Sequence, residues 1–112
     1  MRGIFGPLAA TVLALVAMTG PAAAGCVAGS CNDVVNDLFV HGSGVYLRTA
    51  GDETQLNCTL AEGFFMLLKK THTNYEAIYA ALLTAHTNRA PIFIRVVEGS
   101  ADCEVSYVRS QF

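Results

Sequence analysis

The chain has 112 residues, of which 53% are hydrophobic and 14% charged, and its formal net charge is −2. Its seven Lys and Arg residues are scattered apart from Lys69-Lys70, whereas nucleic-acid-binding proteins usually gather an excess of positive charge in a stripe. This composition argues against a nucleic-acid partner and indicates one small globular domain.

The first residues have the pattern of a secretory signal. Arg2 precedes an apolar run from Leu8 to Met18, and the helix breakers Gly20 and Pro21 lead into Ala22-Ala23-Ala24. We expect a signal peptide over residues 1–24, with cleavage after Ala24 and a secreted or periplasmic mature protein. Because Gly20 and Pro21 interrupt the apolar run, no membrane span is expected in the mature form.

An alternative form of processing involves Cys26. The segment Ala23-Ala24-Gly25-Cys26 resembles a degenerate bacterial lipobox, although the usual Leu is missing from its first position. In that case Cys26 would be acylated and the protein would be a lipoprotein anchored at this residue.

Cleavage after Ala24 leaves 88 of the 112 residues, a single domain (25–112) whose core only marginally offsets chain entropy. The four cysteines all lie in this part, and an even number in a short exported chain is typical of a disulfide framework. They are Cys26, Cys31, Cys58 and Cys103. Of three pairings, we favour Cys26–Cys31, which closes a short flexible loop, and Cys58–Cys103.

No metal or cofactor is expected, because there is no CxxC pair and an oxidising compartment disfavours zinc thiolates.

The first half of the mature chain predicts a β-meander that follows a polar N-terminal arm, Gly25 to Asp33. Alternating residues between turn sequences predict strands over 35–41, 45–49 and 54–60. In the last of these, Cys58 alternates in phase with Leu56 and Leu60, so its sulfur is expected to point into the core. The apolar run 64–68 does not alternate and fits either a doubly buried strand or the start of a helix.

The second half predicts one helix and two strands. Apolar residues recur at helical spacing at Tyr75, Ile78, Tyr79, Leu82 and Leu83. Thr73 and Glu76 fit a capping box, and the helix is expected to end near His86. Two faces of strands follow, the first formed by Ile92, Ile94 and Val96 and the second by Cys103, Val105 and Tyr107. The order predicts an α+β fold, a small OB-like, partly open five-stranded antiparallel barrel with one helix.

Three segments carry a family resemblance, namely Leu56-Asn57-Cys58, residues 80–95 and Cys103. Their order of strand cysteine, Leu/Ala helix, Pro-led aliphatic strand and closing cysteine resembles the B subunits of AB5 toxins of the subtilase and pertussis-like group. The resemblance covers about half of the mature chain and implies an OB-like barrel. The chain departs from the family at Ala90, which stands in place of a glycine, and no sugar-contacting residue matches.

Residues suited to catalysis are few. His72 and His86 flank opposite ends of the predicted helix, about 20 Å apart, and His41 lies at a strand end, so they share no metal through that helix. The acidic pairs Asp52-Glu53 and Asp102/Glu104 have no histidine or serine placed beside them by a motif. We therefore expect no catalytic residues and no enzymatic activity.

A candidate ligand surface lies on the outer faces of two predicted strands. Tyr46 and Arg48 lie opposite the Val45/Leu47 face, and Phe93 and Arg95 lie opposite the Ile92/Ile94 face. Aromatic and guanidinium groups together suit a sugar or a protein hot spot. The competing interpretation has Tyr46 and Phe93 facing the helix, while the arginines extend along the surface or pair with carboxylates.

These patterns predict a non-enzymatic secreted or periplasmic module that binds a protein or a glycan. A periplasmic inhibitor or accessory subunit of another protein is the alternative, and a small hydrolase is a third. The last strand, 103–110, has little protection of its edge, so head-to-tail pairing into a homo-oligomeric ring is expected. In the competing monomer, the Gly25 to Asp33 arm covers that edge.

Overall fold

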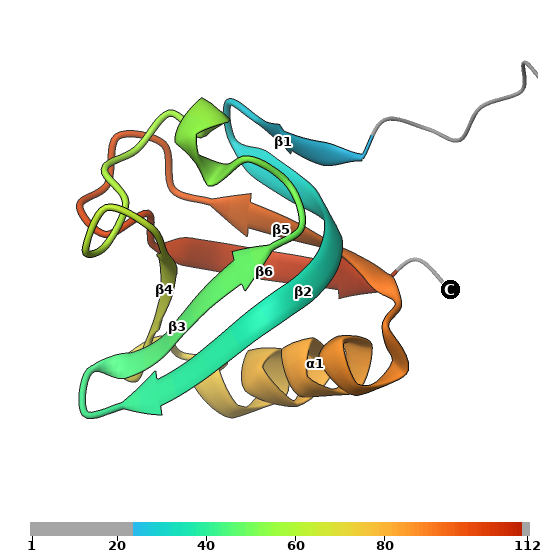
Figure 1. Ribbon diagram of the computed structural model, residues 1–112. Helices are drawn as coiled ribbons and strands as arrows, with labels where there is room; N and C mark the ends of the chain where they lie inside the picture. The colour runs from blue at the N-terminus through green and yellow to red at the C-terminus, as the bar shows by residue number, and fades with distance from the viewer. Residues whose placement is uncertain (1–23, 111–112) are drawn as a thin grey trace, which may run out of the picture.

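The computed structural model describes residues 24–110, so residues 1–23 of the predicted signal peptide lie outside the described part (Figure 1). The elements in chain order are β1 (Gly25–Val27), β2 (Ser30–His41), β3 (Gly44–Thr49), the 3-10 helix η2 (Glu53–Gln55), β4 (Met66–Lys69), α1 (Tyr75–Asn88), β5 (Pro91–Val96) and β6 (Val105–Ser110). The fold is small and α+β, as predicted. Within residues 24–110, no helix is long and apolar enough to cross a membrane.

The long strand β2 organises the sheet, whose order is β4-β3-β2-β5-β6 with β1 added on β2. The first part of β2 pairs antiparallel with β1 and β5, and its second part pairs antiparallel with β3. The sheet therefore bends along β2, and α1 lies beneath it (Figure 1). At the far ends of the order, the Leu67 N–H donates to Cys103 O at 3.1 Å, beside one parallel bridge between Leu67 and Glu104.

The core lies between the sheet and α1 and is built by alternation along the strands. Val45 and Leu47 are fully buried, as are Ile92 and Ile94, and all four belong to one hydrophobic cluster with Leu82 of α1. The predicted inward face of β5 is thus confirmed. The helical stripe is confirmed at Ile78 and Leu82, which are buried, and it continues to the buried Ala85. Leu83 is 43% exposed, because it lies about 100° around the helix from Leu82.

No strand spans the predicted range 54–60. The chain instead forms η2, where the Asp52 carboxylate accepts a hydrogen bond from Thr54 N–H at 3.1 Å. Two isolated bridges follow, from Leu56 to Ala28 and from Thr59 to Ala101. The alternating apolar residues of this segment are therefore positions that pack against the core in an irregular connection, and they do not form a β-strand.

The N-terminal segment predicted as an arm is a β-hairpin. Gly25–Val27 pairs with the start of β2, with Cys26 directly opposite Cys31. The strand predicted over 35–41 begins five residues earlier, at Ser30. Of the two interpretations of the run 64–68, the strand is observed, as β4.

The ends of two later elements also differ from the prediction. Asn74, and not Thr73, is the N-cap of α1, and its side chain makes no capping hydrogen bond. A turn takes up the nearby donors, since Tyr75 N–H donates to His72 O and Asn74 N–H donates to His72 Nδ1. Cys103 precedes β6, and Tyr107 is 48% exposed, because the register slips at Arg95/Val96 in the pairing of β5 with β6.

Gly44 permits the close approach of β3 to β4. A Cβ atom at this position would lie 2.0 Å from the backbone oxygen of Leu68, far inside van der Waals contact. The backbone φ of Gly44 is +142°, which side-chain-bearing residues rarely adopt. The glycine of the predicted turn is therefore required for strand packing as well as for the turn.

Both predicted disulfides are present, Cys26–Cys31 and Cys58–Cys103. The first joins opposite residues of the β1–β2 hairpin. The second, with a sequence separation of 45, ties the irregular segment after η2 to the residues that lead into β6. Cys103 is fully buried, whereas Cys58 is half-buried against the hydrophobic core.

Removing the long-range disulfide should cost far more stability than removing the short one. The chain-entropy model gives about 4 kcal/mol for a loop of this length and about 2 kcal/mol for the hairpin loop. We expect urea unfolding to show this difference between Cys58→Ala/Cys103→Ala and Cys26→Ala/Cys31→Ala. Equal losses in the two double variants would contradict the assignment of roles.

Candidate functional site

Five aromatic side chains gather on one outer surface, and we call this group the aromatic face. They come from the end of β2, from β3 and from the segment that leads into β4. The aromatic face consists of Phe39, His41, Tyr46, Phe64 and Phe65. Phe39 and Tyr46 are direct cross-strand partners, on the side of β3 opposite the buried Val45 and Leu47.

The rings of the aromatic face pack on Tyr46. Tyr46 stacks on Phe65 with ring centroids 5.1 Å apart and planes 5° apart, and His41 lies 3.9 Å away on Tyr46. Phe39 meets Tyr46 edge to face at 5.8 Å. Such arrangements are favourable for aromatic pairs and hold the rings at fixed angles to one another.

Two rings of the aromatic face remain open to solvent. Phe39 is 52% exposed and Phe64 is 58% exposed, whereas Tyr46 and Phe65 are half-buried. The Arg48 guanidinium lies 5.8 Å from the centroid of the Phe65 ring. The result is an exposed apolar surface with a cation at its border, which is a composition found at binding sites.

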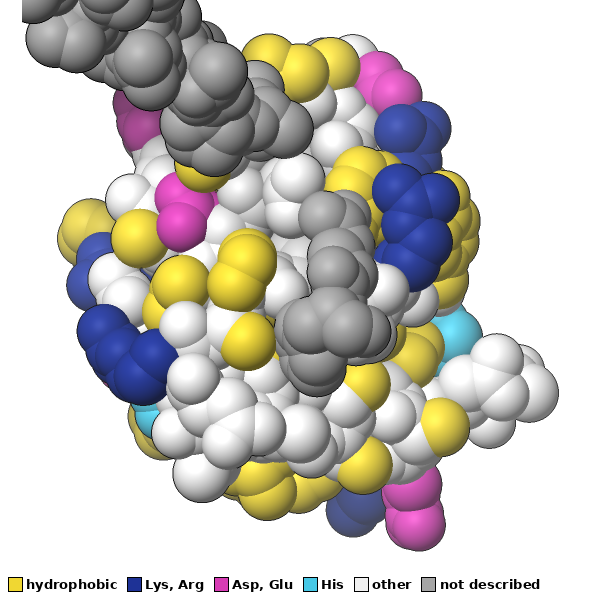
Figure 2. Space-filling model, turned by 90° about the vertical axis from the view of Figure 1, so that its right-hand side faces the viewer, with side chains coloured by type: hydrophobic (Ala, Val, Ile, Leu, Met, Phe, Trp, Pro, Cys, Tyr) yellow, Lys and Arg dark blue, Asp and Glu magenta, His cyan; other side chains and the backbone are white. Residues whose placement is uncertain are grey.

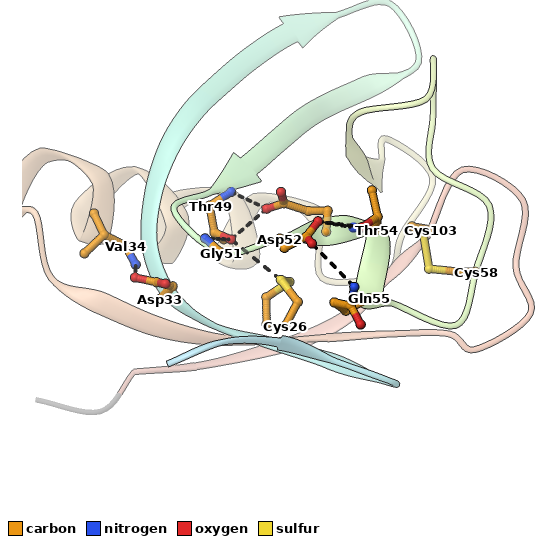
Figure 3. Close-up of a disulfide and its surroundings, with 12 residues drawn as sticks. Cys26, Asp33, Val34, Thr49, Gly51, Asp52, Thr54, Gln55, Cys58 and Cys103 are labelled. Atoms are coloured by element: carbon orange, nitrogen blue, oxygen red, sulfur yellow. Dashed lines mark hydrogen bonds between the residues drawn. A yellow bond between two sulfur atoms is a disulfide. The ribbon is translucent and has the colours of Figure 1, made fainter. Parts of the chain in front are cut away.

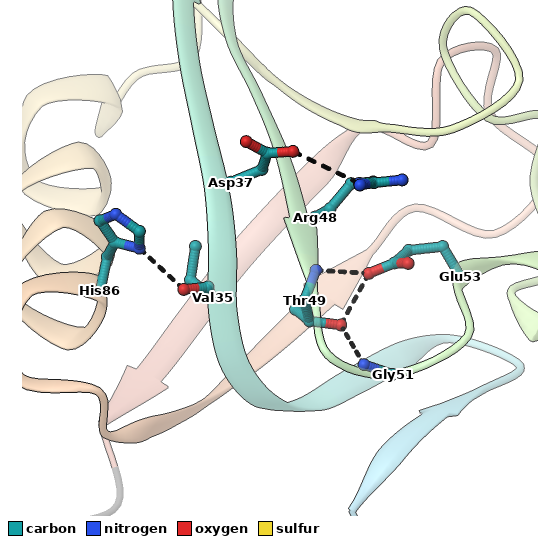
Figure 4. Close-up of polar contacts among 7 residues, drawn as sticks. All are labelled: Val35, Asp37, Arg48, Thr49, Gly51, Glu53 and His86. Carbon is teal, nitrogen blue, oxygen red and sulfur yellow. Dashed lines mark hydrogen bonds and ion pairs between the residues drawn. The ribbon is translucent and has the colours of Figure 1, made fainter.

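Hydrogen bonds fix the groups around this surface. The Arg48 Nε lies 3.5 Å from Asp37 Oδ2, and both side chains are about half exposed (Figure 4). Ser43 N–H donates to His41 Nδ1 at 3.2 Å. The neutral ring therefore carries its proton on Nε2, which is buried and has no partner among the described residues.

The four predicted ligand residues belong to two separate surfaces. Tyr46 lies opposite Phe39 on β2, whereas Phe93 lies opposite Asn32, and seven residues of strand correspond to roughly 20 Å. Phe93 contacts Arg109, whose guanidinium lies 4.5 Å from the ring centroid. Tyr46 and Arg48 thus belong to one surface, where both lie against Phe65. Phe93 belongs to the other surface, with Arg109, which the sequence analysis did not name as a ligand residue.

The competing interpretation of these residues is confirmed in part. Both arginines pair with carboxylates, Arg48 with Asp37 and Arg95 with Glu98 at 3.2 Å. Tyr46 does not face the helix, because it lies opposite the residues that pack in the core with α1. Figure 2, which views the C-terminal side of the molecule, shows basic side chains beside hydrophobic ones at its right-hand edge.

The predicted surface missed Phe39, Phe64 and Phe65. Phe39 could have been found only by allowing for a bulge, because strict alternation places it on the same face as the buried Val35; the register shift between Val35 and Asp37 turns Phe39 outward, opposite Tyr46. Phe64 and Phe65 could not, because their run fits a buried strand and only the turn at residues 61–65 directs them outward. The pairing register of β2 with β3, which joins residues distant in sequence, and the turn at residues 61–65 together assemble the surface.

The histidines at the two ends of α1 are engaged by backbone groups. His72 Nε2 bonds Ser106 O at 2.8 Å and Nδ1 accepts from Asn74 N–H. His86 Nδ1 donates to Val35 O at 2.7 Å. These rings connect elements of the fold, and His72 has no nitrogen left for proton transfer.

Two exposed charged groups have shifted pKa values with local causes. Hydrogen bonds from Thr54, first from its hydroxyl and then from its backbone, lower the pKa of Asp52. The hydrogen bond and charge of Glu104, 2.7 Å away, raise the pKa of Lys69.

Lys69 and Glu104 line a surface pocket of about 300 Å³ together with Thr71, His72 and Thr73. The pair therefore neutralises the charge of this pocket.

Comparison with protein-family models, with curated proteins and with solved structures finds no match to this chain.

The exposed rings of the aromatic face should contribute little to folding. We expect Phe39→Ser and Phe64→Ser each to lower the free energy of unfolding by less than about 1 kcal/mol, as is usual for surface positions. Leu47→Ala, at a fully buried position of β3, should cost about 2–5 kcal/mol. Urea unfolding of the three variants measures the difference, and a loss at Phe39 or Phe64 as large as that at Leu47 would make the face part of the core.

Proposed function

We propose that this protein is a secreted or periplasmic binding module without enzymatic activity, and that its aromatic face binds a glycan. The observation that carries the proposal is the half-exposed Phe39 beside the parallel stack of Tyr46 on Phe65. Rigid rings held by one another, with open edges and faces, form a preorganised apolar surface, which lowers the entropic cost of binding.

The chemistry of this surface suits a sugar ring. A pyranose has an apolar face of C–H groups that can lie on an aromatic ring, and hydroxyls around its rim that need hydrogen-bond partners. The exposed Phe39 and Phe64 provide the open rings beside the stacked Tyr46 and Phe65. The pair Arg48 and Asp37 provides donors and acceptors at the border, half exposed to an incoming ligand. A charged donor and acceptor at a ring's edge fix the orientation of a polar ligand.

The strand order supports an OB-like, partly open barrel. Five strands, β2 to β6, run in the order β4-β3-β2-β5-β6 with a helix between β4 and β5. The parallel bridge from Leu67 to Glu104 brings the first and last strands of that order together. OB folds bind oligosaccharides and oligonucleotides on the face of their second and third strands, which correspond here to β3 and β4, where the aromatic face lies.

The two disulfides and the signal-like N-terminus support export. Cys26 is buried and bonded to Cys31, so acylation of Cys26 would leave Cys31 without its partner. We therefore favour a signal peptide cleaved after Ala24 over the lipoprotein.

An inhibitor or accessory subunit is the second candidate, and the exposure of Phe39 and Phe64 favours it. Aromatic side chains of this exposure also anchor protein hot spots. A protein partner would bury both rings in pockets of its own. This candidate would be supported if the same face bound one purified protein and the glycan array showed no binding.

Glycan binding should be lost when the aromatic face is changed. We expect the exported protein to bind members of an immobilised glycan array, and Phe39→Ser/Phe64→Ser to lose affinity by at least about tenfold, because stacking residues dominate such sites. Leu83→Ser is the matched control, since Leu83 is 43% exposed on α1. A silent array, or an equal loss in the control, would contradict glycan binding at this face.

The last strand is also proposed to join copies of the chain into a head-to-tail ring, as the resemblance to toxin B subunits implies. In the competing monomer, the N-terminal segment would cover the edge of β6. Its strand β1 pairs with β2 instead, so it does not cover that edge. On β6 itself, His72 satisfies Ser106 O, which is a local protection of the edge.

Light scattering on the purified protein at tens of micromolar tests the ring. We expect a mass several times that of the monomer, and a lower mass for Tyr107→Lys, because an edge lysine disfavours strand pairing. A monomer mass for the unmodified protein would remove the ring, while leaving binding by a single aromatic face intact.

A further inference from the structure

The Cys26–Cys31 disulfide lies against a buried carboxylate. Thr49 and Glu53 are the buried polar side chains of the described residues, with exposures of 5% and 7%. The two sulfurs and a carboxylate oxygen of Glu53 lie within 4.8 Å of one another. Asp52-Glu53 looks like an ordinary turn pair in the sequence, yet η2 turns Glu53 inward onto the disulfide.

Thr49 links the carboxylate to the nearer sulfur. Its N–H and its hydroxyl both donate to Glu53 Oε2 at 2.6 Å, and its Oγ1 accepts from Gly51 N–H at 3.1 Å (Figure 4). On the other side, Thr49 Oγ1 lies 3.8 Å from Cys26 Sγ (Figure 3). The chain Cys26, Thr49 and Glu53 is therefore continuous.

The directions of these hydrogen bonds favour the reduced thiol of Cys26 over the disulfide. Thr49 has one hydroxyl hydrogen, and the hydroxyl donates it to Glu53 Oε2. Toward Cys26, the hydroxyl thus presents a lone pair, and a disulfide sulfur has no hydrogen to donate to it. A thiol at Cys26 has one, so reduction would complete the path from the Cys26 S–H through the Thr49 hydroxyl to Glu53.

Exchange requires the hairpin to open, because Cys26 and Cys31 are 8% and 0% exposed and belong to the core cluster. β1 has three residues and pairs with β2 at the edge of the sheet, and Val27 is 68% exposed. Short edge strands lie at the low end of local stability. The separate Cys58–Cys103 disulfide would keep the rest of the domain stapled during such an opening.

We propose that Cys26 and Cys31 form a reversible redox site that exchanges electrons with an exported dithiol/disulfide partner. In oxidation, the Cys26 thiol passes its proton through Thr49 to Glu53, and the thiolate attacks the partner's disulfide. This step forms a mixed disulfide and releases one partner thiolate. The released partner thiolate takes the proton of the Cys31 thiol, and the Cys31 thiolate then attacks the Cys26 sulfur. This attack releases the second partner thiolate, which takes up the proton held by Glu53, so two electrons and two protons pass to the partner. Reduction by the partner dithiol follows the same steps in reverse.

Selective opening is the first test. The protein is equilibrated in buffers of reduced and oxidised dithiothreitol, alkylated with N-ethylmaleimide and mapped by peptide mass spectrometry. We expect a range of buffers in which Cys26 and Cys31 are alkylated while Cys58 and Cys103 stay bonded, and full reversal in oxidised dithiothreitol. Simultaneous opening of both disulfides, or opening of the hairpin disulfide only in denaturant, would overturn the proposal.

The rate of exchange tests the proton path. Glu53→Gln keeps an oxygen that accepts from Thr49 but cannot take a proton, and Thr49→Val removes the hydroxyl. Both should slow oxidation of the reduced hairpin by at least about tenfold, whereas Thr49→Ser should restore the original rate. Thermal unfolding identifies variants that do not fold. If Glu53→Gln is among them, the Thr49→Val and Thr49→Ser pair decides, and equal rates in this pair would overturn the path through Thr49.

Discussion

The disulfide between Cys58 and Cys103 is the constraint on which the remainder of the fold depends. It closes the part of the chain that contains β4, α1 and β5, and it holds an irregular segment against the start of β6. Directly beside it, Leu67 N–H donates to Cys103 O, so the covalent bond and the contact between β4 and β6 support each other. A core of this size offsets chain entropy only narrowly, and the bridge removes entropy from the unfolded chain.

The aromatic face follows from the same core. Because Val45 and Leu47 are fully buried, strand geometry turns Tyr46 and Arg48 to the opposite surface. The register of β2 with β3 then sets Phe39 beside Tyr46, and the turn before β4 adds Phe65. Packing inside the domain therefore determines the arrangement of rings outside it, which is why a binding surface can be rigid on a small scaffold.

Local patterns were sufficient where one physical rule dominated. Alternation identified the buried face of β5, helical spacing located α1, and loop length selected the disulfide pairs. Prediction failed where a distant partner decided the structure, since the alternation around Leu56 reflects contact with the hairpin at Ala28. It also failed at the start of α1, where a turn in which His72 accepts from Asn74 and Tyr75 N–H replaces the predicted capping box. The candidate surface is divided in the structure, because Tyr46 on β3 and Phe93 on β5 lie opposite different parts of β2.

NMR of the aromatic side chains tests whether the aromatic face is the binding surface. A glycan taken from a positive array spot is titrated into the isotope-labelled protein while the ring resonances are followed. We expect saturable shifts at Phe39, Tyr46 and Phe65, with Phe93 and Tyr107 unchanged. Shifts confined to Phe93 and Tyr107, on the surface that Arg109 covers, would contradict it.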